Sequence, residues 1–324
     1  MPHAIRIHAY GGPEVMRWEE VASVAPGRGE ALVRQTAVGL NFIDVYERTG
    51  LYGGTLPTGL GREAAGVVEA VGPGVRDFKV GDRVAYASTS PGAYADERVL
   101  PVASLVPVPE GVSDRLAAAA LLKGMTAQVL LRRTYKVRKG TVVVVHAAAG
   151  GVGSILTQWA LHLGAHVIAV VGSDAKAAMV RAMGCKDVLI QGRDDLAARS
   201  KELSGGRGAH VVYDSVGKDT FFASLDSLRP LGLMVTYGNA SGPVPPIAPL
   251  ELARRGSLFL TRPTLFAYTA KRADLLKSAA ELFDVIGRGI VRIEIGQTYP
   301  IRDVQQAHRD LSERRTVGST VLLP

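Results

Sequence analysis

Residues 141–160 constrain the fold of this chain more than any other segment. The apolar, β-branched run 141–145 is followed by a turn of small residues and then by a helical pattern. Strand, glycine turn and helix in this order are typical of a dinucleotide-binding site. Gly150 and Gly151 let backbone N–H groups approach a pyrophosphate because no Cβ stands in the way. The positive N-terminal end of the helix would face the anion, although Ala148 replaces the first glycine of the usual G-x-G-x-x-G motif.

The composition is that of a globular protein without internal disulfides. The 324 residues suffice for two domains, and 47% hydrophobic with 21% charged residues is ordinary for such a protein. Cys185 is the only cysteine, no apolar segment could span a bilayer, and residues 1–6 do not resemble a secretory signal, so we expect a cytoplasmic location. The net charge of +8 comes from scattered Lys and Arg without interleaved aromatics. We therefore do not expect nucleic acid as the principal ligand, and we expect part of the charge to serve a phosphate-rich cofactor.

The chain changes character near residue 109. Before it, apolar runs such as 31–38 and 65–72, separated by Gly and Pro, predict a small rolled β-domain. After it, Ser113 is the predicted N-cap of a helix over 115–122. Strands predicted at 142–145, 166–171, 188–190, 209–213 and 233–237 then alternate with helices at 151–163, 175–183, 220–228 and 274–286. This order predicts an α/β, doubly wound parallel sheet, while the last thirty residues (strand near 297–299, helix 303–311, strand 320–323) return to the first domain.

The end of the second strand of this sheet indicates which nicotinamide cofactor is bound. An NAD site usually has an Asp or Glu there for the ribose 2′-hydroxyl, whereas this chain has Gly172 and Ser173. Lys176 follows one turn later and can pair with a 2′-phosphate, or it is simply a solvated helix charge. Asp174 is interpreted as the cap of the helix that starts at Ala175. The pattern favours NADPH over NADH.

No residue pattern indicates a metal site or a covalent nucleophile. One cysteine and seven scattered histidines supply no zinc cluster, and no G-x-S-x-G elbow is present. His146, at the end of a core strand, is predicted to be structural. We expect residues 213–215, at the end of another strand, to contact the cofactor. If the protein is an enzyme, it transfers hydride without a metal.

Several segments together resemble the quinone oxidoreductase (zeta-crystallin-like) group of the medium-chain dehydrogenase/reductases. The similarity extends over nearly the whole chain and is carried by residues 8–15, 39–46, 49–52, 59–68, 81–84, 146–153, 213–217, 238–239 and 261–263. Zinc-dependent members of this superfamily carry Gly-His-Glu where this chain has Gly61-Arg62-Glu63, so the resemblance also implies a metal-free protein.

The resemblance implies a GroES-like β-rich catalytic domain at 1–122 and 293–324, and a doubly wound Rossmann NADPH-binding domain at 123–292, with the active site in the cleft between them. It implies four catalytic residues, Asn41, Asp44, Tyr46 and Tyr52. The two tyrosines would bound the substrate pocket, with Asp44 beside them; packing within the β-domain is the alternative role for each tyrosine.

The resemblance also implies a set of cofactor contacts. Asn41 and Thr126 would lie near the nicotinamide. Ser173, Lys176 and Arg314 would hold the 2′-phosphate. The pyrophosphate and the remaining edge of the cofactor would be held by Ala149, Gly150, Gly151, Val152, Ser215, Gly238, Asn239, Arg262 and Thr264.

Two positions depart from the family pattern. Many relatives have a tyrosine in an Asn-Tyr-Arg sequence that reads Gln191-Gly192-Arg193 here. That tyrosine flanks the adenosine phosphate, so we expect weaker cofactor binding unless Arg193 compensates. Leu161 stands where a basic residue is common, and we expect this change to be neutral.

The expected activity is metal-free hydride transfer from NADPH to a quinone. Reduction of an activated C=C bond in an enone or alkenal requires the same features, so sequence motifs cannot separate the two. A binding role, in RNA association or as a crystallin-like protein, is a further alternative. The apolar segment 256–261 is predicted to be an open sheet edge that pairs two copies into a homodimer, with Leu258 in the seam; a loop covering the edge would instead give a monomer.

Overall fold

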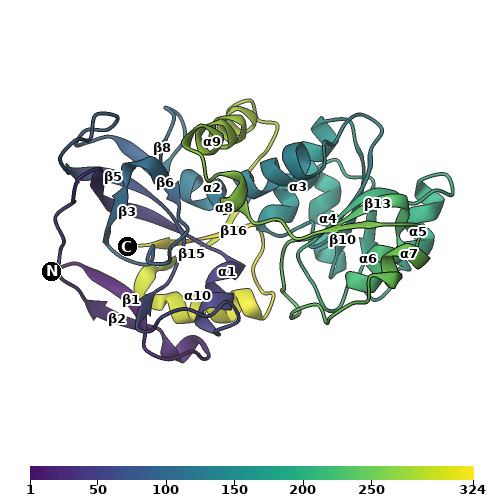
Figure 1. Ribbon diagram of the computed structural model, residues 1–324, viewed down its shortest axis with the longest axis horizontal. Helices are drawn as coiled ribbons and strands as arrows, with labels where there is room; N and C mark the ends of the chain where they lie inside the picture. The colour runs from purple at the N-terminus through teal and green to yellow at the C-terminus, as the bar shows by residue number, and fades with distance from the viewer. The chain divides into compact units, whose positions relative to one another are not determined.

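The computed structural model describes all residues, 1–324, and divides into two compact units (Figure 1). The first contains Met1–Gly124, Thr269–Gly287 and Ile293–Pro324, and the second contains Met125–Tyr268 and Arg288–Arg292. The helix expected at 274–286 belongs to the first unit, although the sequence placed it in the nucleotide domain. Leu282 of this helix packs so closely on Gly124 that a Cβ there would lie 2.2 Å from Leu282 Cδ1.

The first unit is built on β-sheets. Its seven-stranded sheet has the order β15-β16-β3-β5-β6-β8, with β7 paired to β3, and a second sheet has the order β2-β1-β4. The antiparallel pairing of β16 with β3 confirms that the C-terminal segment returns to this unit. The strands are β1 (His3–Ile7), β2 (Arg17–Glu20), β3 (Glu30–Leu40), β4 (Thr58–Gly59), β5 (Glu63–Val71), β6 (Arg83–Ala87), β7 (Glu97–Pro101), β8 (Leu105–Pro107), β15 (Ile295–Pro300) and β16 (Ser319–Leu323).

Few helices accompany these sheets. They are α1 (Phe42–Arg48), α9 (Arg272–Gly287), α10 (Val304–Ser312) and the first part of α2 (Asp114–Val129), with short turns η1 (Pro13–Val15), η2 (Val102–Ser104) and η4 (Ile301–Asp303). The predicted cap of α2 is confirmed, because Ser113 Oγ accepts the backbone N–H of Leu116 at 3.2 Å.

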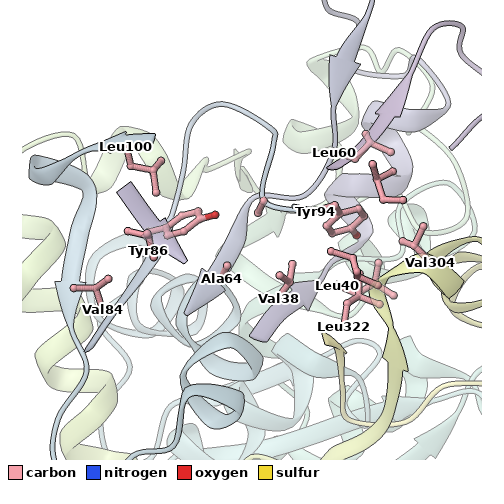
Figure 2. Close-up of a cluster of buried hydrophobic side chains, with 14 of the residues drawn as sticks. Val38, Leu40, Leu60, Ala64, Val84, Tyr86, Tyr94, Leu100, Val304 and Leu322 are labelled. Atoms are coloured by element: carbon pink, nitrogen blue, oxygen red, sulfur yellow. The ribbon is translucent and has the colours of Figure 1, made fainter. Parts of the chain in front are cut away.

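The core of the first unit contains two fully buried tyrosines among aliphatic side chains. Figure 2 shows Tyr86 near Val84 and Leu100, and Tyr94 near Leu40 and Leu60. A buried phenol requires a hydrogen-bond partner for its hydroxyl. Both tyrosines have one, and the partners of Tyr94 lead to the candidate site.

The second unit is a parallel sheet surrounded by helices (Figure 1). Its strand order is β11-β10-β9-β12-β13-β14, and every neighbouring pair is parallel. Numbered within the unit, this is the order 3-2-1-4-5-6 of dinucleotide-binding domains. The doubly wound sheet predicted from the sequence is therefore confirmed. Its strands are β9 (Val142–Val145), β10 (His166–Val171), β11 (Asp187–Ile190), β12 (Ala209–Asp214), β13 (Leu228–Thr236) and β14 (Phe259–Thr261).

The helices of this unit follow the expected alternation. They are α3 (Gly151–His162), α4 (Asp174–Ala182), α5 (Leu196–Leu203), α6 (Phe221–Asp226), α7 (Leu250–Arg254), α8 (Leu265–Tyr268) and the π-helical η3 (Leu130–Thr134) that continues α2. The prediction of a helix through residue 228 is wrong, because β13 begins at Leu228. No helix in either unit is long and apolar enough to cross a membrane.

Candidate functional site

Asn41 is held by two buried carboxylates at the junction of β3 and α1. It is the N-cap of α1, and its backbone N–H donates to Asp44 Oδ2 at 2.8 Å. Its side-chain Nδ2 donates to Glu63 Oε2 at 2.9 Å. Because one acceptor fixes the backbone and the other fixes the amide, the side chain of Asn41 has a defined orientation.

Asp44 lies beneath Asn41 and does not reach the surface. Its carboxylate is fully buried and accepts the hydroxyl of Tyr94 at 2.7 Å in addition to the N–H of Asn41. Burial raises the pKa of Asp44 to about 7, and the negative charge of Glu47 adds to this shift. In this structure the carboxylate of Asp44 contacts Asn41 and Tyr94, and its place beside the two tyrosines of the substrate pocket stays a prediction.

Two ion pairs balance the other buried carboxylates. Glu63 Oε2 accepts from Lys123 Nζ at 3.2 Å, and Glu63 Oε1 accepts the backbone N–H of Leu122 at 2.6 Å. The guanidinium of Arg62 bonds to Glu47 Oε1 through Nε and Nη2. Burial raises the pKa of Glu47, and the charge of Arg62 opposes that shift. Glu63 and Glu47 therefore each have a cationic partner.

Tyr46 and Tyr52 meet edge to face, with ring centroids 5.3 Å apart. They differ in exposure: Tyr46 is 7% exposed and also packs near Phe42, whereas Tyr52 is 48% exposed. An exposed ring braced by a buried one can stack against a flat ligand. Tyr52 is thus the better candidate for substrate contact, and Tyr46 supports it.

The glycine turn of the second unit has the geometry that a phosphate cradle requires. Gly150 caps α3, and a Cβ on Gly153 would lie 2.2 Å from the carbonyl oxygen of Ala147. Ala147 itself has a left-handed backbone with φ of 49°. Ala149 is buried, whereas Gly151 and Val152 remain partly accessible at the helix N-terminus, where backbone N–H groups have no partner within the helix.

The end of β10 is arranged differently from the expectation in one respect. Ser173, not Asp174, caps α4, and its Oγ accepts the backbone N–H of Lys176 at 3.4 Å. Asp174 is the first helical residue, and both its oxygens lie 3.2 Å from the guanidinium of Arg193. Gly192, before that arginine, has φ of 81°, which a tyrosine would adopt only with strain.

The carboxyl ends of β12 and β13 bring several predicted residues together. A Cβ on Gly238 would lie 2.4 Å from the carbonyl oxygen of Ser215. Arg262 Nη1 donates to Gly238 O at 3.2 Å, and Arg262 Nη2 lies 3.0 Å from the side-chain oxygen of Asn239 when the amide is oriented to satisfy both its polar atoms. Thr264 follows, exposed, after β14.

A buried polar cluster supports this edge from below. Asp214 Oδ1 accepts the N–H groups of Val216 and Gly217 at 2.7 and 3.1 Å, which fixes the turn around Ser215. Ser224 Oγ bridges Asp214 Oδ2 at 3.1 Å and His146 Nε2 at 2.8 Å. Burial lowers the pKa of His146, so the ring is neutral, in agreement with the structural role predicted for it.

Two further predicted cofactor residues belong to other elements. Thr126 is partly buried on α2. Arg314 is exposed, has φ of 61° and belongs to the first unit. Their contacts with the cofactor remain predictions. Three residues of the buried network could not be predicted from the sequence, because none of them belongs to a motif: Tyr94, Lys123 and His308.

Comparisons with known proteins agree with this geometry. Residues 151–283 match the family described as zinc-binding dehydrogenase, and residues 27–110 match the alcohol dehydrogenase GroES-like domain. The chain is 49% identical to a quinone oxidoreductase of Pseudomonas aeruginosa, with all of both chains covered. It is 46% identical to a 2-haloacrylate reductase of a Burkholderia species, covering 100% of this chain and 99% of that one. The crystal structure of Escherichia coli quinone oxidoreductase complexed with NADPH matches with a TM-score of 0.97 at 43% identity, covering 99% of this chain and 100% of the other.

A GroES-like β-domain followed along the chain by a parallel sheet of this strand order defines a medium-chain dehydrogenase/reductase. The full-length identities go further. The chain belongs to the zinc-free quinone oxidoreductase (zeta-crystallin-like) family within that superfamily.

Zinc does not fit the residues of this chain. No group of three or more His, Cys, Asp or Glu side chains is arranged to hold a metal ion. The guanidinium of Arg62 supplies the positive charge beside Glu47. A cation fixed to the chain therefore neutralises this carboxylate.

Proposed function

We propose that this protein is an NADPH-dependent quinone reductase. The observation that carries the proposal is the carboxyl edge of the parallel sheet, where a glycine turn opens α3 and where Lys176 follows Ser173. A relative with 43% identity binds NADPH in its crystal structure, which supports the same cofactor here. When bound, NADPH supplies the hydride.

Residues of the second unit, together with Arg314 of the first, bind and orient this cofactor. Ala149 and Gly150 form the turn before α3, and the backbone N–H groups of Gly151 and Val152 face the pyrophosphate. Ser173 and Lys176, with Arg314, hold the 2′-phosphate. The remaining edge is formed by the cluster at the ends of β12 and β13, which comprises Ser215, Gly238, Asn239, Arg262 and Thr264.

Asn41, Thr126 and the two tyrosines act at the reacting end. Asn41 and Thr126 contact the nicotinamide, and the exposed ring of Tyr52 stacks on the flat acceptor, supported by Tyr46. These groups supply proximity and orientation, which convert a bimolecular hydride transfer into an effectively unimolecular one. The proton that completes quinone reduction comes from solvent or from a tyrosine hydroxyl.

The test is NADPH oxidation followed at 340 nm with 1,4-benzoquinone and 9,10-phenanthrenequinone. The proposal predicts saturable turnover with NADPH and a higher KM with NADH. A protein that binds NADPH but is inert toward a broad quinone panel would refute it.

A second activity is favoured by one specific comparison. The 46% identical Burkholderia relative is named as a 2-haloacrylate reductase, and a 2-haloacrylate contains an activated C=C bond. Hydride delivery to an alkene carbon would use the same cofactor and the same exposed ring of Tyr52. An enone, alkenal or haloacrylate is therefore the alternative acceptor.

We further propose that β14 joins two copies into a homodimer in the cytoplasm. β14 is the last strand of its sheet, and its Phe259 and Leu260 are 60% and 38% exposed. Such an apolar edge can pair with its own copy. Leu258, expected in the seam, is only 6% exposed and packs in the core of the unit, so that assignment is corrected to Phe259 and Leu260.

A further inference from the structure

A chain of buried polar groups runs from Arg48 on α1, through His308 on α10, to Asn41. Arg48 Nη1 lies 3.3 Å from His308 Nδ1, and His308 Nε2 lies 3.1 Å from the Tyr94 hydroxyl. Tyr94 in turn donates to Asp44 Oδ2, which also accepts the N–H of Asn41. Residues far apart in the sequence therefore converge on one backbone N–H.

The chemistry of the donors allows only one direction along this chain. Arg48 can only donate, so His308 Nδ1 accepts and the ring proton sits on Nε2. His308 Nε2 then donates to Tyr94, which leaves the phenolic proton for Asp44. Burial and the charge of Arg48 lower the pKa of His308 to about 3, which keeps the ring neutral as this pattern requires.

All four members are removed from water. Asp44, Tyr94 and His308 are fully buried, and Arg48 is nearly so. Hydrogen bonds in such surroundings are strong, and a missing partner is costly. The three elements that carry the members are α1, α10 and the segment before β7, so the chain ties the start of α1 to the C-terminal part of the first unit.

We propose that Tyr94 and His308 are positioning residues that hold Asn41, through Asp44, in the orientation needed for hydride transfer. The inference rests on the proposed function, in which Asn41 contacts the nicotinamide. Neither residue touches substrate or cofactor; both act on the carboxylate that accepts the N–H of Asn41.

The ionisation of Asp44 gives this role a pH signature. The charged and titratable groups that act on Asp44 are Glu47 on α1, Lys123 on α2 and Tyr94, with His308 on α10 and then Arg48 on α1 behind the Tyr94 hydroxyl. Asp44 Oδ1 has no hydrogen-bond partner, so it is the oxygen that takes up a proton. A protonated Asp44 is a weaker acceptor for Asn41.

The chain offers a matched control for removing the Tyr94 hydroxyl. Tyr86 is also fully buried in the same core cluster (Figure 2), and its hydroxyl donates to Gln35 Oε1 at 2.5 Å. Tyr86→Phe removes a buried tyrosine hydroxyl from the same core cluster but leaves the hydrogen-bond chain to Asn41 intact.

The experiment compares wild type, Tyr94→Phe and Tyr86→Phe for kcat, KM, NADPH affinity and pH dependence. We expect Tyr94→Phe to lower kcat about tenfold, with NADPH affinity changed less than twofold, whereas Tyr86→Phe keeps the wild-type kcat. We also expect the fall in kcat below pH 7 to move to higher pH in Tyr94→Phe, because the tyrosine hydrogen bond that lowers the Asp44 pKa is lost. Asp44→Asn should show no such transition.

A second readout does not depend on activity. Hydrogen exchange of the backbone N–H of Asn41 at pH 8 should be faster in Tyr94→Phe than in wild type or Tyr86→Phe. If Tyr94→Phe fails to fold, His308→Gln, which keeps a donor and an acceptor, should retain activity that His308→Leu loses. Equal kcat, pH profile and exchange in the two tyrosine variants would overturn the inference, as would equal activity of the two His308 variants. A wild type inert with quinones would instead refute the proposed function.

Discussion

The guanidinium of Arg62 pairs with the buried carboxylate of Glu47. Removing one partner of a buried pair leaves an uncompensated charge. We expect Arg62→Gln to reduce the free energy of unfolding by about 3–5 kcal/mol in urea. The control is Arg34→Gln, which breaks an exposed pair with Glu69 and should cost about 0–1 kcal/mol. Equal losses in the two variants would contradict this role of the Arg62–Glu47 pair.

The glycine turn gives a second prediction. Gly153→Ala places a Cβ against the carbonyl oxygen of Ala147, so the turn must shift. We expect NADPH affinity to fall at least about tenfold and stability to fall by about 1–3 kcal/mol. Gly287→Ala, which meets nothing within 4 Å, should change neither. Calorimetric titration with NADPH measures the difference, and wild-type affinity in Gly153→Ala would argue against the cradle.

Cofactor choice should depend on Lys176. Losing a charge-assisted contact to phosphate should weaken NADPH binding by about 1.5–3 kcal/mol in Lys176→Ala and leave NADH almost unchanged. Lys201→Ala, an exposed lysine on α5, is the control. If Lys176→Ala weakens the binding of NADPH and NADH equally, Lys176 does not contact the 2′-phosphate.

The carboxylate of Asp174 should repel the 2′-phosphate of NADPH. It holds Arg193 and adds a negative charge at the start of α4. We expect Asp174→Asn to tighten NADPH binding severalfold, because it frees the guanidinium that can replace the missing tyrosine at Gly192. The gain should vanish when Arg193→Ala is added, and a gain that persists would exclude Arg193 as the compensating residue.

Asp44 should impose a pH dependence on stability. Its folded-state pKa of about 7 lies above the ordinary 3.8, so its contribution is fully present below about pH 4 and is lost as pH rises through 7. Relative to Asp44→Asn, wild-type stability should therefore decline between pH 4 and 8. A constant difference between the two proteins across that range would contradict the raised pKa.

The sequence predicted the elements that depend on local pattern. The valine run of β9 and the glycine turn indicated a parallel, nucleotide-binding sheet in the second unit, because a central parallel strand is buried on both faces and reads as continuously apolar. The network around Asn41 could not be predicted in this way. Asp44, Tyr94 and His308 meet only after three distant segments pack together, and no residue spacing in the sequence predicts that contact. The burial of Leu258 was missed because the alternation of a three-residue strand is too short to show which side faces the core.

The most direct test of the central claim compares acceptors under one set of conditions. With saturating NADPH, kcat/KM is measured for 1,4-benzoquinone and 9,10-phenanthrenequinone, and for a 2-alkenal and 2-chloroacrylate. A quinone reductase should prefer the best quinone by at least about tenfold over every C=C acceptor, which corresponds to about 1.4 kcal/mol of transition-state stabilisation. A kcat/KM for the alkenal or the haloacrylate that equals or exceeds the quinone value would contradict the claim.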